Sequence, residues 1–392
     1  MVSLKQKFLL VFCLIMLAGL LLSMTYTVNY NTLNVSASSV YAYSGAYSSA
    51  RSMIVIETGS NGVIYGKNYS EKLAEASTTK IATAITVIDN CKNLDEIVTV
   101  TKPATLVEGT SIYLRVGEKL SVRDLLYGLM LQSGNDAATA LAIHVGGSVD
   151  GFAKLMNETA VKCGALNTNF VNPHGLDNPN HYTTAYDLAL ITSYALKNKD
   201  FKEIVSSKRR QIPATENNTA RTLINKNRLL GSLNGCVGVK TGYTSKAGRC
   251  LVTACSRGGF EFVCVVLNCG PMFEESEELI NQAYKEYELY TVLPDYNFID
   301  EVSVLDGDKD SVKLYNKDGY KIVLKKGEAE NITVKYNYPA VLEAPLKKDQ
   351  KVGTAEVFMS GNLIFTADIY TIEQAESKDI RDKIKDMLDK WF

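Results

Sequence analysis

The stretch Glu75–Thr83, E-A-S-T-T-K-I-A-T, constrains this chain more than any other. Ser77 and Lys80 lie three residues apart in it, immediately before an apolar run that predicts a helix. Positions i and i+3 of a helix share one face, so we expect the two side chains to be neighbours near its N-terminus. A neutral lysine amine can take the proton of a serine hydroxyl and turn it into a nucleophile. The alternative is a serine that caps the helix, followed by a solvated lysine.

The composition excludes several classes of function. A formal net charge of −1 over 392 residues lacks the basic excess of a nucleic-acid-binding surface, so no nucleic-acid partner is expected. No glycine-rich phosphate loop with a following Lys-Ser or Lys-Thr occurs, and no dinucleotide fingerprint opens a helix. We therefore expect a protein without a nucleotide or other cofactor.

The eight cysteines do not form a metal-binding pattern. No C-x-x-C pair occurs, and no histidine stands near a cysteine at zinc-ligand spacing, so the sequence predicts no metal site. Apolar, strand-like sequence surrounds four of the cysteines, which are expected to be core residues: Cys250, Cys255, Cys264 and Cys269. A disulfide between two of these four stays open as an alternative.

The N-terminus predicts export. Lys5 and Lys7 precede the apolar run Phe8–Leu22, which has the length of a signal-peptide core. Residues 1–24 are interpreted as a signal peptide or as an uncleaved N-terminal anchor, and residues 25–50 as a polar linker. Both interpretations predict an exported, extracytoplasmic protein. Attachment to the outer face of the cell membrane is expected through the C-terminal segment described below.

Residues 51–293 predict one α+β domain. A hairpin over residues 53–65 begins the domain, and strands over residues 238–267 follow a long helical region. A further helix is expected over Glu274–Val292. Strands at both ends with helices between them indicate an antiparallel sheet covered by helices.

Two further segments complete the chain. Six short alternating strands predict a small all-β, sandwich-like domain over residues 294–371, with hairpin turns at Asp318-Gly319 and Ser360-Gly361-Asn362. Over residues 372–392, apolar side chains recur at helical spacing opposite a charged face, and Trp391 stands next to the C-terminus. Because indole favours the membrane interface, this segment predicts an amphipathic anchor helix. The alternative is a helix packed on its own β-domain.

Three short motifs stand in chain order: Ser77-Thr78-Thr79-Lys80, Ser133-Gly134-Asn135 and Lys240-Thr241-Gly242. They fall at a helix start, in a turn between two helices and on a strand. Each motif alone has a structural explanation as a cap, a turn or a polar strand edge. The set in this order is typical of penicillin-binding proteins and class A β-lactamases.

With these motifs the sequence resembles the serine D-alanyl-D-alanine carboxypeptidases, low-molecular-mass penicillin-binding proteins of bacterial cell-wall synthesis. The resemblance runs from Met53 to the end of the chain, and it includes the Pro173–Asp177 loop and a basic position at Lys226. It implies a β-lactamase/transpeptidase-like catalytic fold, an antiparallel sheet with helices on both faces. The implied substrate is a peptidoglycan stem peptide ending in D-Ala-D-Ala, and the implied inhibitors are β-lactams.

The resemblance also implies a role for each motif residue. Ser77 would attack the carbonyl between the two D-alanines. Lys80, kept neutral by burial and by the second cation Lys240, would take the serine proton. Ser133 would relay that proton to the leaving amine, while Asn135 would orient the substrate amide.

The strand motif would hold the substrate. Lys240 and Thr241 would bind the terminal carboxylate, and Gly242 would let the substrate backbone approach the strand edge. The backbone N–H groups of Ser77 and Tyr243 would bind the oxyanion of the intermediate.

Three alternative functions are weighed against this one. A β-lactamase would share the acylation step, but the E-x-x-L-N string of class A enzymes is absent, and Gly134 stands where they favour aspartate. A Ser–His–Asp hydrolase would use His174 or His181 with Asp177 or Asp187, although no G-x-S-x-G elbow occurs. A non-catalytic wall-binding protein of the same fold is expected to have lost a motif residue, and none is lost.

Overall fold

The computed structural model describes residues 48–379, 381 and 384. The predicted signal segment and nearly all of the polar linker lie outside the described residues. Among the helices of the described part, none combines the length and hydropathy needed to cross a membrane.

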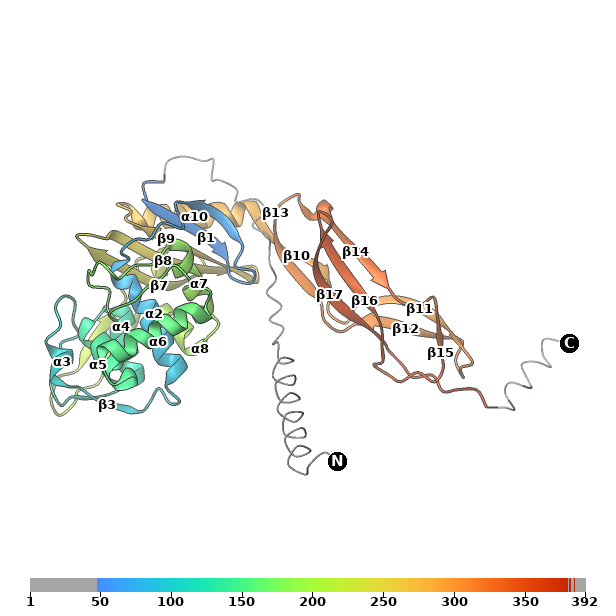
Figure 1. Cartoon of the computed structure of the whole chain (residues 1–392), viewed down its shortest axis with the longest axis horizontal. Coiled ribbons are helices and arrows are strands. Elements are labelled where there is room, and N and C mark those ends of the chain that lie inside the picture. Colours follow the sequence, from blue (N-terminus) through green and yellow to red (C-terminus); the bar gives the residue numbers. More distant parts are fainter. Residues whose placement is uncertain (1–47, 380, 382–383, 385–392) are drawn as a thin grey trace, which may run out of the picture. The chain divides into compact units, whose positions relative to one another are not determined.

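A five-stranded antiparallel sheet forms the centre of the first region (Figure 1), with the strand order β2-β1-β9-β8-β7. Its strands are β1 (Ser52–Glu57), β2 (Val63–Lys67), β7 (Cys236–Thr244), β8 (Gly248–Arg257) and β9 (Phe260–Leu267). The predicted β1–β2 hairpin is confirmed, and β1 also pairs with β9 from the other end of the region. Strand β7 pairs only with β8 in this sheet, so it forms one edge.

Helices cover the sheet on both faces (Figure 1). The helices of this region are η1 (Ala76–Thr79), α2 (Lys80–Asn90), α3 (Lys102–Thr105), α4 (Val122–Leu131), α5 (Asn135–Gly146), α6 (Val149–Lys162), α7 (Ala185–Leu196), α8 (Lys199–Ser206), α9 (Leu229–Ser232) and α10 (Met272–Glu286). Two small ribbons pair β3 (Ile97–Thr99) with β4 (Lys119–Ser121) and β5 (Arg209–Ile212) with β6 (Arg221–Ile224).

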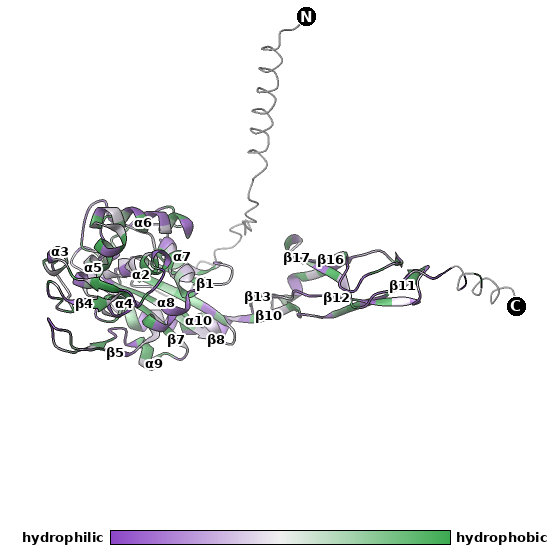
Figure 2. Ribbon diagram, turned by 90° about the horizontal axis from the view of Figure 1, so that it is seen from below, coloured by the Kyte–Doolittle hydropathy of each residue, from purple (hydrophilic) through white to green (hydrophobic). Residues whose placement is uncertain are grey.

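Both faces of the sheet are buried because successive side chains of each strand enter two different cores. Ile54 and Ile56 of β1 join one core with residues of α2, α4, α5 and α7. Met53 and Val55 join the other core with residues of α10. The hydropathy colouring shows apolar residues on the strands and on the helices against them (Figure 2). This double burial explains why these strands read as continuous apolar runs in the sequence.

The predicted helix over Glu274–Val292 is wrong at its C-terminal end. Helix α10 ends at Glu286, and Tyr287–Leu293 form strand β10. This strand runs antiparallel to β13 (Tyr320–Lys325). The segment Y-E-L-Y-T-V-L is rich in aromatic and β-branched residues, which favour a strand once a partner strand is available.

The C-terminal region is all-β, and the six predicted strands are present. A six-stranded sheet has the order β14-β16-β17-β12-β11-β15 and has its own apolar core. Its elements are β11 (Phe298–Leu305), β12 (Ser311–Asn316), η2 (Ala329–Asn331), β14 (Ile332–Asn337), β15 (Val341–Glu343), β16 (Lys351–Met359) and β17 (Asn362–Thr371). The sequence pattern did not predict β15, which pairs in parallel with β11.

One predicted hairpin in this region is confirmed and the other is wrong. Strands β16 and β17 pair across the Ser360-Gly361 turn. Strands β12 and β13, which flank Asp318-Gly319, lie in different sheets. Gly319 instead donates its N–H to Asp295, and a Cβ at this position would lie 2.6 Å from the carbonyl oxygen of Leu293. The glycine therefore serves a close crossing of two chain segments.

The predicted helix over residues 372–392 does not start at residue 372. Residues 372–379 contain no helix, and Ala375 and Ser377 form isolated β-bridges with Leu346 and Gly307. Ala375 is fully buried in the β-domain core, which explains the extended conformation. Residue 380 and most of the following residues lie outside the described part, so the amphipathic helix stays a prediction.

Candidate active site

Ser77 lies in the turn η1, and Lys80 is the first residue of the helix α2 that follows. Nζ of Lys80 lies 2.9 Å from Oγ of Ser77. Ala76, directly before the serine, has a φ of 51° in the left-handed region. Such a conformation costs a non-glycine residue about 1–3 kcal/mol, so the surrounding structure must hold this turn in place.

Two glycines allow the chain to close around this turn. A Cβ on Gly175, in the predicted Pro/Gly loop, would lie 1.9 Å from the carbonyl oxygen of Ala76. A Cβ on Gly242 would lie 3.0 Å from the backbone nitrogen of Ser77. The main chains of the loop and of the edge strand β7 therefore pack directly against the serine turn. A side chain at either glycine would displace the turn.

Lys80 is fully buried and makes three hydrogen bonds. Nζ donates to the amide oxygen Oδ1 of Asn135 at 2.7 Å and to the carbonyl oxygen of His174 at 2.7 Å, and its third contact is Ser77. The amine thus joins the helix start, the interhelical turn and the Pro/Gly loop. Two of its three partners can only accept a hydrogen bond.

The environment disfavours the charged form of Lys80. Burial is the main cause that lowers the pKa of Lys80 well below its ordinary value, and the cations Lys240 and Lys226 lower it further. Asp136 acts in the opposite direction. The carboxylate of Asp136 is already occupied by hydrogen bonds from Ser111, Ile112, Leu114 and Ala137. Desolvation and neighbouring positive charge are the two effects that produce a neutral lysine.

The second motif lies between α4 and α5, as predicted. Ser133 is buried and adopts a φ of 63°, a second left-handed non-glycine residue at this site. Asn135 opens α5, and its backbone N–H donates to Thr110 at 2.7 Å. Its side-chain nitrogen donates to the carbonyl oxygen of Glu108. The Asn135 amide is therefore fixed between Glu108 and Lys80.

The third motif lies on the edge strand β7. The Lys240 side chain is buried, and its Nζ donates to the carbonyl oxygen of Thr241 at 3.0 Å. Burial, and after it the cation Lys226, lowers the pKa of Lys240 to about 7. Tyr243 is 66% exposed, so its side chain points away from the core.

Three lysines, Lys80, Lys226 and Lys240, therefore act on one another electrostatically at this site. Lys226 is an exposed residue, and the partial burial of its amine also lowers its pKa. None of the three forms an ion pair with a carboxylate within the described residues. A site of this kind attracts an anionic ligand, because the ligand supplies the missing counter-charge.

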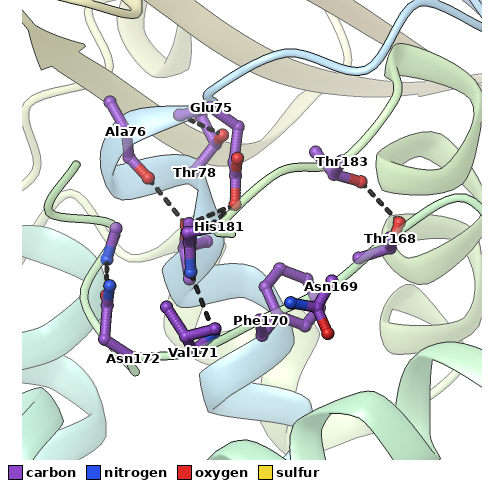
Figure 3. Close-up of polar contacts among 12 residues, drawn as sticks. Glu75, Ala76, Thr78, Thr168, Asn169, Phe170, Val171, Asn172, His181 and Thr183 are labelled. Atoms are coloured by element: carbon purple, nitrogen blue, oxygen red, sulfur yellow. Dashed lines mark hydrogen bonds and ion pairs between the residues drawn. The ribbon is translucent and has the colours of Figure 1, made fainter. Parts of the chain in front are cut away.

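A buried pair of Glu75 and His181 lies at the residue that precedes the serine turn (Figure 3), and the sequence did not indicate it. Nε2 of His181 lies 2.8 Å from Oε1 of Glu75, and both side chains are inaccessible to solvent apart from 2% of the histidine. Nδ1 of His181 accepts from the backbone N–H of Val171, so Nε2 carries the proton that faces Glu75. The hydroxyl of Thr79 donates to the same carboxylate oxygen at 2.8 Å.

The same glutamate also holds the turn through its backbone. Its carbonyl oxygen accepts from the N–H and the hydroxyl of Thr78. Glu75 thus holds Thr78 and Thr79, the two residues that follow Ser77 in the sequence. No local signal could identify this pair, because His181 lies 106 positions from Glu75 in the sequence.

The histidines and aspartates of the alternative Ser–His–Asp hydrolase form hydrogen bonds with residues other than Ser77. Burial, and then the charges of Lys80 and His181, lowers the pKa of His174 to about 3, and its Nδ1 accepts from the backbone of Leu176. Asp177 accepts from Thr244. Asp187 accepts from Asn167 and Thr168 at the start of α7. These side chains are structural, and the described hydrogen bonds join neither histidine to Ser77.

The seven described cysteines are free thiols. Cys250, Cys255, Cys264 and Cys269 are fully buried, as predicted for core residues, and no disulfide joins any two of them.

Comparisons with known proteins agree over most of the chain. Residues 39–270 match the family model of D-alanyl-D-alanine carboxypeptidases, and residues 287–377 match that of the penicillin-binding protein 5 C-terminal domain. D-alanyl-D-alanine carboxypeptidase DacF of Bacillus subtilis is 30% identical, over 87% of this chain and 90% of its own length. DacC of Escherichia coli is 35% identical, over 88% of this chain and 89% of its own length.

Solved structures give the same result. Penicillin binding protein 5 from Haemophilus influenzae superimposes with a TM-score of 0.66 at 29% identity. The match covers 85% of this chain and 99% of that structure. Both the mixed helix-and-sheet region and the all-β region therefore have counterparts in one known protein.

Proposed function

The chain belongs to the D-alanyl-D-alanine carboxypeptidase family, and from the site described above we propose that Ser77 is its acylated nucleophile and Lys80 the base that activates it. The protein is a serine D-Ala-D-Ala carboxypeptidase, a hydrolase that removes the terminal D-alanine of peptidoglycan pentapeptides and is sensitive to penicillin. The roles of the individual residues are the proposal.

One observation carries it: the three contacts of the Lys80 amine. A neutral amine has two N–H groups and one lone pair. Asn135 Oδ1 and the His174 carbonyl oxygen can only accept, so they take the two N–H groups. The lone pair then faces the Ser77 hydroxyl, 2.9 Å away, which is the one partner of the three that can donate. The amine is oriented for proton abstraction before substrate arrives.

The reaction follows from this orientation. Lys80 takes the hydroxyl proton while Ser77 Oγ forms a bond to the carbonyl carbon between the two D-alanines. When the C–N bond breaks, the proton passes by way of Ser133 to the leaving amine, and D-alanine departs. Water then attacks the ester carbonyl while Lys80 takes a proton from that water. When the bond between the carbonyl carbon and Ser77 Oγ breaks, Lys80 returns the proton to Oγ, which regenerates Ser77. A β-lactam acylates the same oxygen by ring opening, so its leaving amine stays attached.

The lysine cluster supports recognition of the substrate's terminal carboxylate. Lys240 and Thr241 lie on the edge strand, where a peptide can pair with the free backbone groups of β7. A carboxylate beside Lys240 raises the pKa of that lysine and keeps it charged. The bound anion thereby replaces the ion-pair partner that the buried lysine lacks.

The oxyanion site is assigned to the backbone N–H groups of Ser77 and Tyr243. Gly242 lies on β7, where the strand faces the serine turn, and it supports this assignment. A Cβ at this position would lie 3.0 Å from the Ser77 nitrogen, so the absence of a side chain lets the strand come this close to the turn. Only backbone groups take part, so the exposed Tyr243 side chain is not required. Asn135 is assigned to bind the amide of the substrate. The Asn135 side chain can do so through the hydrogen-bonding capacity that Glu108 and Lys80 do not use.

Labelling with a fluorescent penicillin tests the nucleophile. Wild type is expected to give one stable covalent adduct per chain, and Ser77→Ala none. A pentapeptide ending in D-Ala-D-Ala should release free D-alanine with wild type only, and an added acceptor amine separates hydrolysis from transpeptidation. Rapid release of hydrolysed penicillin would indicate a β-lactamase instead. A wild-type protein that takes up no label would indicate a non-catalytic wall-binding protein.

We also propose that the chain is exported and attached to the outer face of the cytoplasmic membrane. The basic head with its apolar run near the N-terminus and the amphipathic C-terminal segment support this location. Fractionation of cells that express the full chain, or a chain ending at Asp379, tests the C-terminal contribution. Equal membrane recovery of the two chains would remove the C-terminal segment from the proposal.

A further inference from the structure

A second cluster of reactive side chains lies away from the active site. Cys91, Glu96 and His144 bring a thiol sulfur, a carboxylate oxygen and an imidazole nitrogen within 4.8 Å of one another. Nε2 of His144 lies 2.7 Å from Oε1 of Glu96. These are three of the side-chain types that bind transition metals, and their ligand atoms are close neighbours.

The backbone holds each of the three residues in a defined place. Cys91 caps the C-terminus of α2, and its N–H donates to Val87 at 2.9 Å. Glu96 accepts the backbone N–H of Val122 at 3.0 Å through its own carbonyl oxygen. His144 lies in the last turn of α5. The main chain is therefore held in place at each of the three residues.

We propose that Cys91, Glu96 and His144 bind one Zn²⁺ ion, with water as the fourth ligand. Thiolate and imidazole ligands favour Zn²⁺ over Mg²⁺ and Ca²⁺, which require oxygen ligands. A thiolate and a carboxylate together neutralise the charge of the ion. The side chains of Glu96 and His144 are 41% and 29% exposed, so the ion and its water can enter from solvent.

Zinc binding requires the Cys91 thiol to lose its proton. Burial and then the Glu96 carboxylate raise the pKa of the Cys91 thiol to about 11. In the free protein the thiol therefore keeps its proton. On binding, the S–H bond is replaced by an S–Zn bond and the proton is released to solvent.

The ion would join the two helices that form the active site. Helix α2 begins with Lys80 and α5 begins with Asn135, and these two residues hydrogen-bond to each other. Cys91 and His144 lie at the opposite ends of the same two helices. Zinc would therefore link the far ends of the helices and stabilise their packing without touching the reacting groups.

Titration of the full chain with Co²⁺ under reducing conditions tests the site. A thiolate bound to Co²⁺ gives a near-ultraviolet charge-transfer band, which should saturate at one equivalent and disappear when Zn²⁺ is added. Cys91→Ser should abolish the band, and Glu96→Gln and His144→Asn should each weaken binding by about tenfold or more. Zn²⁺ should raise the thermal transition of wild type but not of Cys91→Ser.

Cys163→Ser is the matched control. Cys163 is a free, partly buried thiol at the C-terminal cap of α6, and burial raises its pKa to about 11 as well. Its replacement should leave the band unchanged, and penicillin labelling checks that every variant is folded. Absence of a band in wild type, or a band that survives in folded Cys91→Ser, would overturn the proposal.

Discussion

The two regions of the described chain treat charge in different ways. Between residues 48 and 286, the fold buries seven charged side chains and a histidine: Glu57, Glu75, Lys80, Glu118, Asp136, His181, Asp187 and Lys240. Between residues 287 and 379, the buried polar side chains of the described part are neutral, namely Asn316 and Thr371. Burial of a charge is costly unless hydrogen bonds or an opposite charge compensate for it. The first region buries charged groups despite this cost, whereas the buried polar side chains of the second region, within the described residues, are neutral.

The buried charges of the first region differ among themselves. Glu118 pairs with Arg221, and Asp136 accepts several hydrogen bonds, so these carboxylates are structural. Lys80 and Lys240 have no ion-pair partner among the described residues. A buried lysine without an ion-pair partner either reduces stability or gives up its proton, so its presence indicates a function that requires it. The comparison therefore separates residues whose loss should affect catalysis from residues whose loss should affect folding.

Replacement of Lys80 by methionine should give the largest effect. The variant keeps the volume of the side chain but has no base, so penicillin acylation should slow by roughly 10²–10⁴-fold. Single-turnover labelling with a fluorescent penicillin measures the rate. Lys246→Met, at an exposed lysine in the β7–β8 turn, is the control and should react like wild type. A Lys80→Met rate within tenfold of wild type would contradict the role of Lys80 as base.

Gly242→Ala should rank second. The new Cβ would lie 3.0 Å from the Ser77 nitrogen and from the Glu75 carbonyl oxygen, so the turn must shift. Displacement of one oxyanion donor typically slows acylation by about 10²–10³-fold. Gly231→Ala is the matched control, because a Cβ there has no atom within 4 Å. Equal acylation rates for the two variants would remove Gly242 from the oxyanion assignment.

Glu75→Ala should affect stability as well as rate. It removes the charged acceptor of the His181 Nε2 proton and the Thr79 hydroxyl, which then have only Thr79 Oγ1 and the Ala76 carbonyl oxygen as neutral acceptors. A hydrogen bond to a charged group contributes about 1.5–3 kcal/mol, so the catalytic region should unfold at a lower temperature. Loss of penicillin labelling on heating reports on this region alone. Glu274→Ala, at a glutamate that is 68% exposed, should leave the transition unchanged. A transition that moves equally in both variants would argue against the support role.

The sequence predicted the part of the site that depends on local spacing. Ser77 and Lys80 meet because a helix start brings positions i and i+3 together, and Ser133 and Asn135 share a short turn. Their order along the chain then matched a known pattern. Turn residues between strand-like runs also predicted the two hairpins that begin the sheet and end the β-domain, and both are present.

The missed features depend on contacts between distant positions. His181 reaches Glu75 across 106 residues, and His144 reaches Cys91 across 53 residues, so neither spacing resembles a motif. Strand β10 was predicted as helix because its sequence suits either form until β13 supplies a partner. Contacts between distant segments decide these cases, and the local spacing and propensity patterns of a single sequence do not reveal such contacts.

Lys240 should make substrate affinity depend on pH, with a smaller effect than the three substitutions. Its pKa is lowered to about 7, so Lys240 is charged below pH 7 and loses its proton as the pH rises. The substrate carboxylate is ionised throughout this range. The KM for the pentapeptide should therefore be constant below about pH 7 and rise by up to about tenfold per pH unit above it.

Lys240→Arg provides the matched test of this pH dependence. Arginine stays protonated at every accessible pH, so the rise of KM at alkaline pH should disappear. A pH-independent KM in wild type, or the same rise in the arginine variant, would show that Lys240 does not bind the carboxylate in its charged form.

Lys309→Ala, in the C-terminal region, should give the smallest effect. Lys309 pairs with Glu373, but the two side chains are 37% and 41% exposed, so water already solvates both charges. Such pairs contribute about 0–1 kcal/mol to stability, and loss of this one should leave acylation unchanged. Urea unfolding, followed by circular dichroism, measures the stability, and Glu373→Ala should give the same small change because it breaks the same pair. A loss of several kcal/mol in either variant would mean that the C-terminal region also depends on compensated charge, and the difference between the two regions would then be one of degree.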